Sequence, residues 1–468
     1  MQRTKFVCQM LIRATLLFLN LSGDRQLRRF SVLREKLMNI QKLGLGRSLV
    51  VASVFLSLTG AAWAHGKVVS VDPPNGFDDT AILQAALNEC VGVPNKCIVQ
   101  LAAGEYKTAQ LLTFGFRGEL KGMGQELTSI LALPDLVSAP LQDGNIPPSP
   151  ESPWPDLIIF VDGNISISDL SVKNLNAPAM QPYDLGGGWW TTSMLSLVRI
   201  MAKDGPMKVV VNNVAIEGVN DWTELSLFGW NVVNGLIVAG EYPTEVITGN
   251  WPDDRILLEG SVSVTDSDFA SVLSGSAMTH FNSAKVTIKG NTFDNVALGP
   301  EIAHMEDSIV KIANNSVSAA WWNGVILYNP YYNVTEASRF LVLNNDIQIA
   351  GEWSAGIGQF DNWDGTASQH VTITGNHIDV AEGALGIFMS PSNGTLAAAN
   401  VIAGQGFTGI FADASSECRL LGNDVSDFTG DVGPKIWLTG SSSNCLVAGS
   451  YEEGDVLDEG VNNVVPGF

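Results

Sequence analysis

Two histidines and two carboxylates have the spacing in this sequence that best suits chemistry. His280 and His304 lie 24 residues apart, and Glu306 and Asp361 follow in a column of polar residues. If one coil of a spiral takes about 24 residues, the histidines stack directly and the carboxylates lie two coils, about 9–10 Å, apart. That separation lets one carboxyl group protonate a leaving group while the other activates water. The two histidines could act as a catalytic base or as a pair of ligands, or they could form a polar stack whose hydrogen bonds go to backbone groups. The alternative for the two carboxylates is a solvated acidic edge without a catalytic role.

Aromatic residues recur beside these polar residues and in the adjoining loops. Outward-facing rings at coil spacing would either stack on sugar rings or lie beneath a loop. The expected substrate-binding residues are Phe281, Tyr328, Phe360, Trp321, Trp322, Trp353 and Trp363. Asp361 and Asp364 offer oxygen ligands of the kind that Ca²⁺ prefers, although no known calcium-binding phrase is present. Ca²⁺ is therefore the one cofactor that the sequence indicates.

A repeated phrase predicts the elements that position these residues. The phrase has two apolar residues one position apart, two spacers, an asparagine, one spacer and another apolar residue. It recurs around Asn291, Asn315, Asn345, Asn376 and Asn423, with a weaker copy around Asn400, at steps of 23 to 31 residues. Short period-2 strands with asparagine and glycine at the bends predict an all-β parallel β-helix, or β-solenoid. We expect the asparagines to stack as a hydrogen-bonded ladder.

The same repeat predicts a vertical register. It places Phe281, Met305, Tyr328 and Phe360 in one column, and Asn282, Glu306, Asn329 and Asp361 in the column beside it. A second phrase, Gly-Ile, begins the strand before each asparagine phrase, at Ile357, Ile387 and Ile410. Met278, Ile302, Val325 and Ile436 are expected to share its apolar column.

Composition divides the chain into a leader and an acidic remainder. Residues 1–64 hold a basic stretch, an apolar run and an Ala62-Trp63-Ala64 cleavage box, with Met38 as the expected start and cleavage after Ala64. The alternative is an uncleaved signal anchor. We expect a cap with one helix at 65–96, a β-helix at 97–450, and an acidic tail at 451–468 that closes or leaves the end of the β-helix.

The net charge limits which binding partners are expected, and the cysteine content indicates the cellular compartment. The whole chain has a formal charge of −22, and residues 65–468 have 16 basic and 46 acidic residues, a net charge of −30. Such a chain is unsuited to nucleic acid or to anionic membrane surfaces. Its four cysteines there allow three pairings, of which proximity favours Cys90–Cys97 and Cys418–Cys445. We expect a secreted or periplasmic monomer.

The start of the acidic remainder resembles a known family. Residues 75–86 (NGFDDTAILQAA), 98–106 (IVQLAAGEY) and 120–124 (LKGMG) closely resemble the opening of pectate-lyase-superfamily proteins. The resemblance implies a right-handed parallel β-helix with an N-terminal capping helix, in a superfamily of which many members act on polysaccharides. The Asn-Thr-Asp and Arg-Ile-Lys phrases of its polygalacturonases and the Trp-x-Asp-His phrase of its calcium pectate lyases are absent, so no catalytic set is carried over.

Two functional hypotheses remain from the sequence. The first is a secreted enzyme that cleaves glycosidic bonds in an extracellular polysaccharide. Hydrolysis is favoured over β-elimination, because carboxylates are abundant, fixed cations are few, and a charge of −30 repels a polyuronate unless Ca²⁺ bridges them. The second is a non-catalytic, extracellular or cell-surface glycan-binding or adhesion protein. Both take a polysaccharide or oligosaccharide as partner, with no nucleic acid and no membrane insertion of the mature chain.

Overall fold

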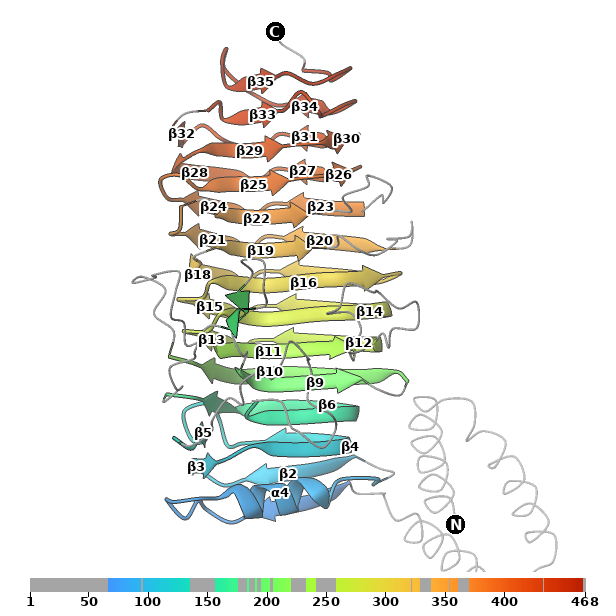
Figure 1. Cartoon of the computed structure of the whole chain (residues 1–468), viewed down its shortest axis with the longest axis vertical. Coiled ribbons are helices and arrows are strands. Elements are labelled where there is room, and N and C mark those ends of the chain that lie inside the picture. Colours follow the sequence, from blue (N-terminus) through green and yellow to red (C-terminus); the bar gives the residue numbers. More distant parts are fainter. Residues whose placement is uncertain are drawn as a thin grey trace, which may run out of the picture. The chain divides into compact units, whose positions relative to one another are not determined.

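The chain from residue 66 onward winds into stacked coils of short strands (Figure 1). The computed structural model describes residues 66–93, 96–134, 156–175, 195–202, 205–219, 233–240, 258–320, 322–328, 338–352, 354–360, 370–431 and 433–465, with two short strands within 183–191. Strands pair in parallel with their counterparts one coil away, as in Val286↔Val310 and Val310↔Phe340. The predicted parallel β-helix is confirmed.

Each coil contributes to three sheets, named here sheet 1, sheet 2 and sheet 3 in chain order around one coil. Four long strands bend from one sheet into the next: β4 (Leu111–Lys121), β6 (Ile158–Lys173), β10 (Met207–Glu217) and β14 (Ser274–Lys289). Sheet 1 otherwise consists of β9 (Leu195–Ala202), β11 (Val233–Gly240), β16 (Leu298–Glu306), β19 (Asn323–Tyr328), β22 (Ala355–Phe360), β25 (Leu385–Met389), β29 (Thr408–Ala412), β33 (Ile436–Leu438) and β35 (Val456–Asp458).

The other two sheets are built in the same way. Sheet 2 adds β1 (Lys67–Val71), β2 (Cys97–Leu101), β12 (Leu258–Thr265), β17 (Ile309–Ala313), β20 (Arg339–Leu343), β23 (His370–Thr374), β27 (Leu396–Ala398), β31 (Arg419–Leu421) and β34 (Leu446–Ala448). Sheet 3 adds β3 (Gly104–Thr108), β5 (Thr128–Ala132), β13 (Asp268–Ala270), β15 (Thr292–Asp294), β18 (Ser316–Ala320), β21 (Asp346–Ile349), β24 (His377–Val380), β28 (Val401–Gly406) and β32 (Phe428–Gly430). Two short pairs lie apart: parallel β26 (Ser392–Asn393) with β30 (Ser415–Ser416), and antiparallel β7 (Tyr183–Asp184) with β8 (Trp190–Thr191).

The asparagine ladder runs along the bend between sheets 2 and 3. The Oδ1 atom of each asparagine accepts bonds from the backbone N–H and the side-chain Nδ2 of the asparagine one coil earlier, at 3.0 and 2.9 Å for Asn345 and Asn315. The ladder continues unbroken from Asn291 to Asn423, and all its members are buried. The residue before each asparagine has a left-handed backbone, for example φ 69° at Gly290 and 52° at Asn344. Glycine and asparagine tolerate that conformation best, which explains the repeated phrase.

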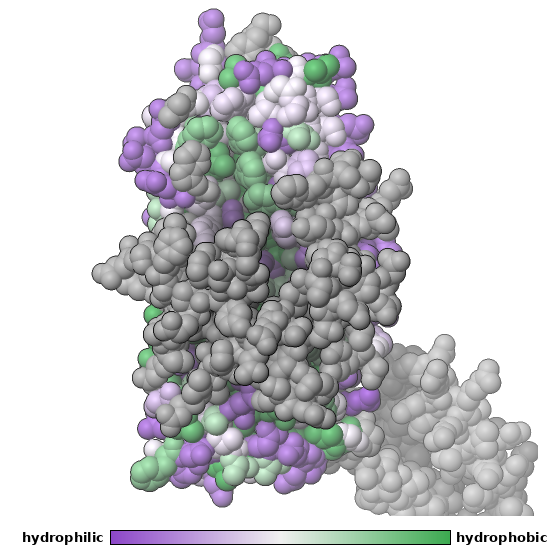
Figure 2. Space-filling view, viewed as in Figure 1, coloured by the Kyte–Doolittle hydropathy of each residue, from purple (hydrophilic) through white to green (hydrophobic). Residues whose placement is uncertain are grey.

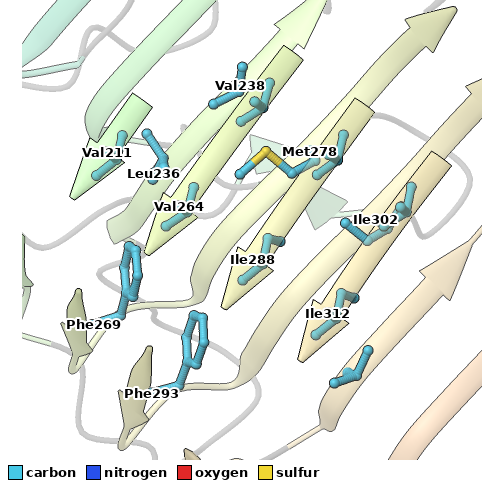
Figure 3. Close-up of a cluster of buried hydrophobic side chains, with 14 of the residues drawn as sticks. Val211, Leu236, Val238, Val264, Phe269, Met278, Ile288, Phe293, Ile302 and Ile312 are labelled. Carbon is cyan, nitrogen blue, oxygen red and sulfur yellow. The ribbon is translucent and has the colours of Figure 1, made fainter. Parts of the chain in front are cut away.

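Inside the coils, apolar side chains from the three sheets stack in columns along the axis, each residue on the one a coil earlier (Figure 3). Val264, Ile288 and Ile312 form one such column in sheet 2, each paired with the next in register. Phe269 and Phe293 lie almost parallel at the sheet 3 side, with ring centroids 4.9 Å apart. The period-2 pattern of the sequence is thus the pattern of inward and outward side chains.

The two ends of the coil stack are covered differently. Helix α4 (Thr80–Asn88) buries Leu83, Ala86 and Leu87 against the first coil, whereas Ile82 is 39% exposed. Its N-cap residue Asp79 accepts hydrogen bonds from the backbone N–H of Asn75 and of Lys107, so the cap is tied to β3. At the other end, the acidic segment after Tyr451 adds a further coil through β35.

Both predicted disulfides are confirmed. Cys90 pairs with Cys97 beside the cap helix, and Cys418 pairs with Cys445 in the last coils. Each bridge closes a local loop, of 7 and 27 residues respectively. Within the described part of the chain, no helix has the length and apolar content needed to cross a membrane.

Candidate functional site

The outer face of sheet 1 holds the predicted site residues that the structure describes. As expected, Phe281 pairs with Met305 and Asn282 pairs with Glu306. The next step is wrong by two residues, because Tyr328 pairs with Ala303 instead of Met305, and Ile302 with Leu327 instead of Val325. A slip of two residues keeps every side chain on its own face of the sheet, so the alternating pattern could not reveal it.

Phe281 was expected to face outward, and this is wrong. Its side chain is fully buried in the core, as is that of Met305 one coil on. The residue before each of them, His280 or His304, has a left-handed backbone (φ 61° and 55°) where β14 and β16 bend toward sheet 2. At that bend the regular alternation of inward and outward side chains is interrupted, so the residue that follows each histidine points into the core.

The two histidines stack at this bend, as predicted. Their ring centroids lie 4.7 Å apart, and both side chains are buried. The Thr279 Oγ1 atom lies 2.7 Å from the Nδ1 atom of His280. The stack is confirmed, and a catalytic role for it stays a prediction.

An unbroken row of aromatic rings continues from the histidines along sheet 1. We call it the aromatic row; its members are His280, His304, Tyr328, Phe360, Phe388, Phe411 and Trp437. Successive centroids after the histidine pair lie 6.0, 6.2, 5.1, 5.7 and 5.4 Å apart. The five residues from Tyr328 onward are half-buried, so part of each side chain reaches the surface. Figure 2 shows apolar surface in the upper part of this face, at the level of β25 and β29 in Figure 1.

The aromatic row moves from one column of residues to the neighbouring column between Phe360 and Phe388, and Gly358 keeps the rings in contact there. Phe360 belongs to the column of Ala303 and Tyr328, whereas Phe388 belongs to the neighbouring column of Gly358. A Cβ atom at Gly358 would lie 3.0 Å from Cε2 of Phe360 and 2.9 Å from Oδ1 of Asn323. The absence of a side chain therefore lets the Phe360 ring lean across Gly358 toward Phe388.

Glu301 is the carboxyl group best placed for acid chemistry beside this row. It pairs with Ala277 and Ile326, in the column that continues to Gly358, Phe388 and Phe411. Burial raises the pKa of Glu301, and the Ser274 hydroxyl, which favours the ionised form, offsets only part of that rise. A carboxyl group with a raised pKa keeps its proton to a higher pH than an ordinary glutamate and is suited to donate it.

Arg199 lies in the same column as Glu301, three coils earlier in the stack. Its guanidinium is buried and bonded to the equally buried carboxylate of Asp156, and its Nη2 atom also donates to Oγ of Ser196 at 3.1 Å. A carboxylate thus already neutralises this cation.

Asp413 marks the far end of the face. Burial alone would raise the pKa of this carboxyl, but hydrogen bonds from the hydroxyls of Thr439, Ser441 and Ser390 outweigh it and lower the pKa below its ordinary value. Asp413 is therefore ionised at neutral pH and stabilises the turn beside Trp437.

Several expected site residues lie outside the described residues: Trp321, Asn329, Trp353, Asp361, Trp363 and Asp364. Glu306 and Trp322 are described and half-buried. Among the residues that the structure describes, no three His, Cys, Asp or Glu side chains form a group that could hold a metal ion. Calcium binding by Asp361 and Asp364 and the pairing of Glu306 with Asp361 stay predictions.

Three members of the row were missed from the sequence, although a signal for them was present. Phe388, Phe411 and Trp437 each directly follow the isoleucine of a repeated inward position: Ile387, Ile410 and Ile436. An aromatic residue next to an inward residue must face outward in a strand.

These features define the class of the protein. Residues 255–425 match the family model described as a right handed beta helix region. The chain has a right-handed parallel β-helix fold.

Comparison with known proteins adds likeness of fold only. No curated protein matches the sequence. Among solved structures, the AlgE6 A-module of a mannuronan C-5 epimerase from Azotobacter vinelandii is 13% identical, with a TM-score of 0.41 over 83% of this chain and 96% of its own. The tailspike protein gp49 of Acinetobacter baumannii bacteriophage Fri1, a capsular polysaccharide depolymerase, is 12% identical, with a TM-score of 0.39 over 85% and 64%. A family 28 exopolygalacturonase from Yersinia enterocolitica is 10% identical, with a TM-score of 0.28 over 86% and 79%.

Proposed function

We propose that the outer face of sheet 1 binds a polysaccharide chain lengthwise, and that Glu301 donates a proton to the leaving oxygen when a glycosidic bond is hydrolysed. The aromatic row is the observation that carries the proposal. A partly exposed ring recurs on each successive coil from Tyr328 to Trp437. Aromatic faces pack on the apolar faces of sugar rings, and a row parallel to the coil axis suits an extended chain.

Hydrolysis fits the charged groups better than β-elimination does. Elimination beside a uronate needs a cation to stabilise the developing negative charge. The cation in the column of Glu301 is Arg199, and Asp156 already neutralises it. Hydrolysis needs instead a proton donor, for which the raised pKa of Glu301 is suited, and a second carboxylate, for which Glu306 and Asp361 remain the predicted candidates.

Export fits the same function. The two disulfides are typical of proteins that fold in oxidising compartments, and residues 38–64 have the pattern of a signal sequence. We therefore place the protein outside the cytoplasm, as a secreted or periplasmic polysaccharide hydrolase.

A non-catalytic glycan-binding protein is the second candidate. The position of the rings favours it: Phe388, Phe411 and Trp437 lie three to five coils beyond Glu301. Stacking on these rings needs no chemistry at Glu301.

A panel of polysaccharides separates the two candidates. Release of reducing ends without ultraviolet-absorbing unsaturated products indicates hydrolysis, and binding without either product indicates the second candidate. In the first case, Glu301→Gln abolishes release but retains binding, whereas exposed Glu417→Gln changes neither. Phe411→Ala weakens binding in both cases, while Phe77→Ala, which removes an 82% exposed ring on the cap, leaves it unchanged. Equal binding by wild type, Phe411→Ala and Phe77→Ala would refute the proposed site.

A further inference from the structure

The basic residues of this acidic protein are concentrated on the outer face of sheet 2. Eight occupy outward positions on its strands: Arg117, Lys121, Lys208, Lys285, Lys289, Lys311, Arg339 and Arg419. Lys96 lies immediately before β2 of the same sheet. On the described strands of this sheet from β4 to β34, the carboxylates at outward positions are Glu119 and, at the start of β12, the exposed Glu259. We call this surface the basic face.

Sheet 3 has the opposite charge. Its outward acidic residues are Glu105, Glu217, Asp268, Asp294, Asp346 and Asp379. The described strands of that sheet carry two lysines, Lys107 and Lys173, each within ion-pair distance of a glutamate. The large negative net charge therefore conceals a separation of charge between two neighbouring faces.

The cations of the basic face have a regular spacing. In register, Arg117 pairs with Asn164, which pairs with Lys208; the column then continues through Ser261 to Lys285. Two coils further on, after Ile309, it reaches Arg339. A positive charge thus recurs at every second coil, about 9–10 Å apart along the axis.

The first part of this column forms an open hollow of about 460 Å³. Lys96, Arg117 and Lys208 line it, together with the polar side chains of Asn164 and Ser166. Lys96 is paired with Glu119 at 2.6 Å, but no described carboxylate forms an ion pair with Arg117 or Lys208. Arg117 and Lys208 are therefore the cations of this hollow that are available to attract an anion.

We propose that the basic face is a second binding site, which holds a chain of acidic polysaccharide along the column from Lys96 to Arg339. The carboxylate or sulfate groups of such a chain would meet a cation at every second coil, and the hollow would anchor one of them through Arg117 and Lys208. This site is separate from the aromatic row, and choosing a glycan over another polyanion rests on the proposed function.

A single glycan chain fits the face better than duplex nucleic acid does. The column is one residue wide, and acidic side chains lie at both bends of the sheet. Asp162, Glu259 and Asp307 lie two residues before the column members Asn164, Ser261 and Ile309, and Asp169 and Asp266 lie at the bend toward sheet 3. A duplex is wide enough to place phosphates over those carboxylates and over acidic sheet 3. The acidic borders would repel it, whereas a narrow chain lies between them.

Binding of the full chain to polygalacturonate, measured by affinity electrophoresis, tests the proposal. The charge-reversal variant is Lys208→Glu/Lys285→Glu, and the matched control is Lys107→Glu/Lys173→Glu, which changes the net charge equally on sheet 3. We expect the first variant to bind about tenfold or more weakly and the control to bind as wild type does. Raising salt to about 0.15 M, where charges are screened over about 8 Å, should weaken wild-type binding. Fully methyl-esterified polygalacturonate, the same chain without charge, should not respond to the Lys208→Glu/Lys285→Glu change.

Three results would overturn the proposal. Equal weakening by both double variants would show a general effect of net charge, and absence of polygalacturonate binding would show no site. Binding of a DNA duplex as tight as that of polygalacturonate, with the same loss in the Lys208→Glu/Lys285→Glu variant, would show the wrong class of polyanion. The Phe411→Ala variant keeps the two sites distinguishable, because it should impair the sheet 1 site and leave the basic face intact.

Discussion

Replacing Asn345 by alanine perturbs the asparagine ladder near its middle. The Oδ1 atom of Asn345 accepts two hydrogen bonds from Asn315. Its Nδ2 atom donates hydrogen bonds to the carbonyl oxygen of Ile312, at 3.2 Å, and to Oδ1 of Asn376, at 2.9 Å. Asn345 is 1% exposed, so water cannot readily replace these bonds. The variant leaves the backbone N–H of Asn315 and the carbonyl of Ile312 without these partners. At about 1–3 kcal/mol for each unsatisfied buried group, the local cost is about 2–6 kcal/mol.

Hydrogen exchange is the appropriate assay for this variant. A stack of coils unfolds in parts, so a single unfolding midpoint does not report the cost at one coil. A loss of 2 kcal/mol corresponds to an acceleration of about thirtyfold, and we expect at least that at the amides of β17, β20 and β21. The control is Asn282→Ala, at a half-buried asparagine outside the ladder, with little expected change. Unchanged protection around Asn345 would refute the view that the ladder stabilises the coils.

The remaining predictions concern packing, protonation and covalent links. Gly358→Ala should displace the Phe360 ring and weaken glycan binding severalfold without unfolding the chain. A titration followed by tryptophan fluorescence measures the affinity, and circular dichroism checks the fold. Unchanged affinity would contradict the role of that glycine. Because its folded pKa is raised, Glu301 contributes stability below its unfolded pKa, and this contribution is lost as the pH rises through the folded pKa. Hydrogen exchange around β16, compared between Glu301→Gln and wild type at each pH, should therefore be relatively slower in the variant above that range than below it, and a difference that does not change with pH would contradict the raised pKa. Replacing Cys418 and Cys445 by alanine, which opens a 27-residue loop, should destabilise the C-terminal coils by about 3–4 kcal/mol, and unchanged exchange there would contradict this.

The fold could be predicted because its determinants are local and repeated. The asparagine phrase combines period-2 strands with a residue suited to a left-handed bend, and the ladder from Asn291 to Asn423 forms as expected. The disulfides follow from proximity as well: Cys418 and Cys445 lie one coil apart, and Cys90 and Cys97 are separated by a short turn between the cap helix and β2.

The site could be predicted only in part, for two physical reasons. A register slip of two residues conserves the inward and outward faces, so the pairing of Tyr328 with Ala303 leaves no trace in the pattern. A left-handed residue within a strand, such as His280, shifts the alternation and turned Phe281 into the core. The raised pKa of Glu301 comes from its burial in the folded chain, which no local phrase encodes.

The crystal structure of the protein soaked with an oligosaccharide that it binds tests the central claim most directly. We predict sugar rings stacked on Tyr328, Phe360, Phe388 and Phe411, with the chain parallel to the coil axis and a glycosidic oxygen within hydrogen-bond distance of Glu301. An oligosaccharide bound over sheet 3, or across the end of the coil stack, with the aromatic row bare, would contradict the account.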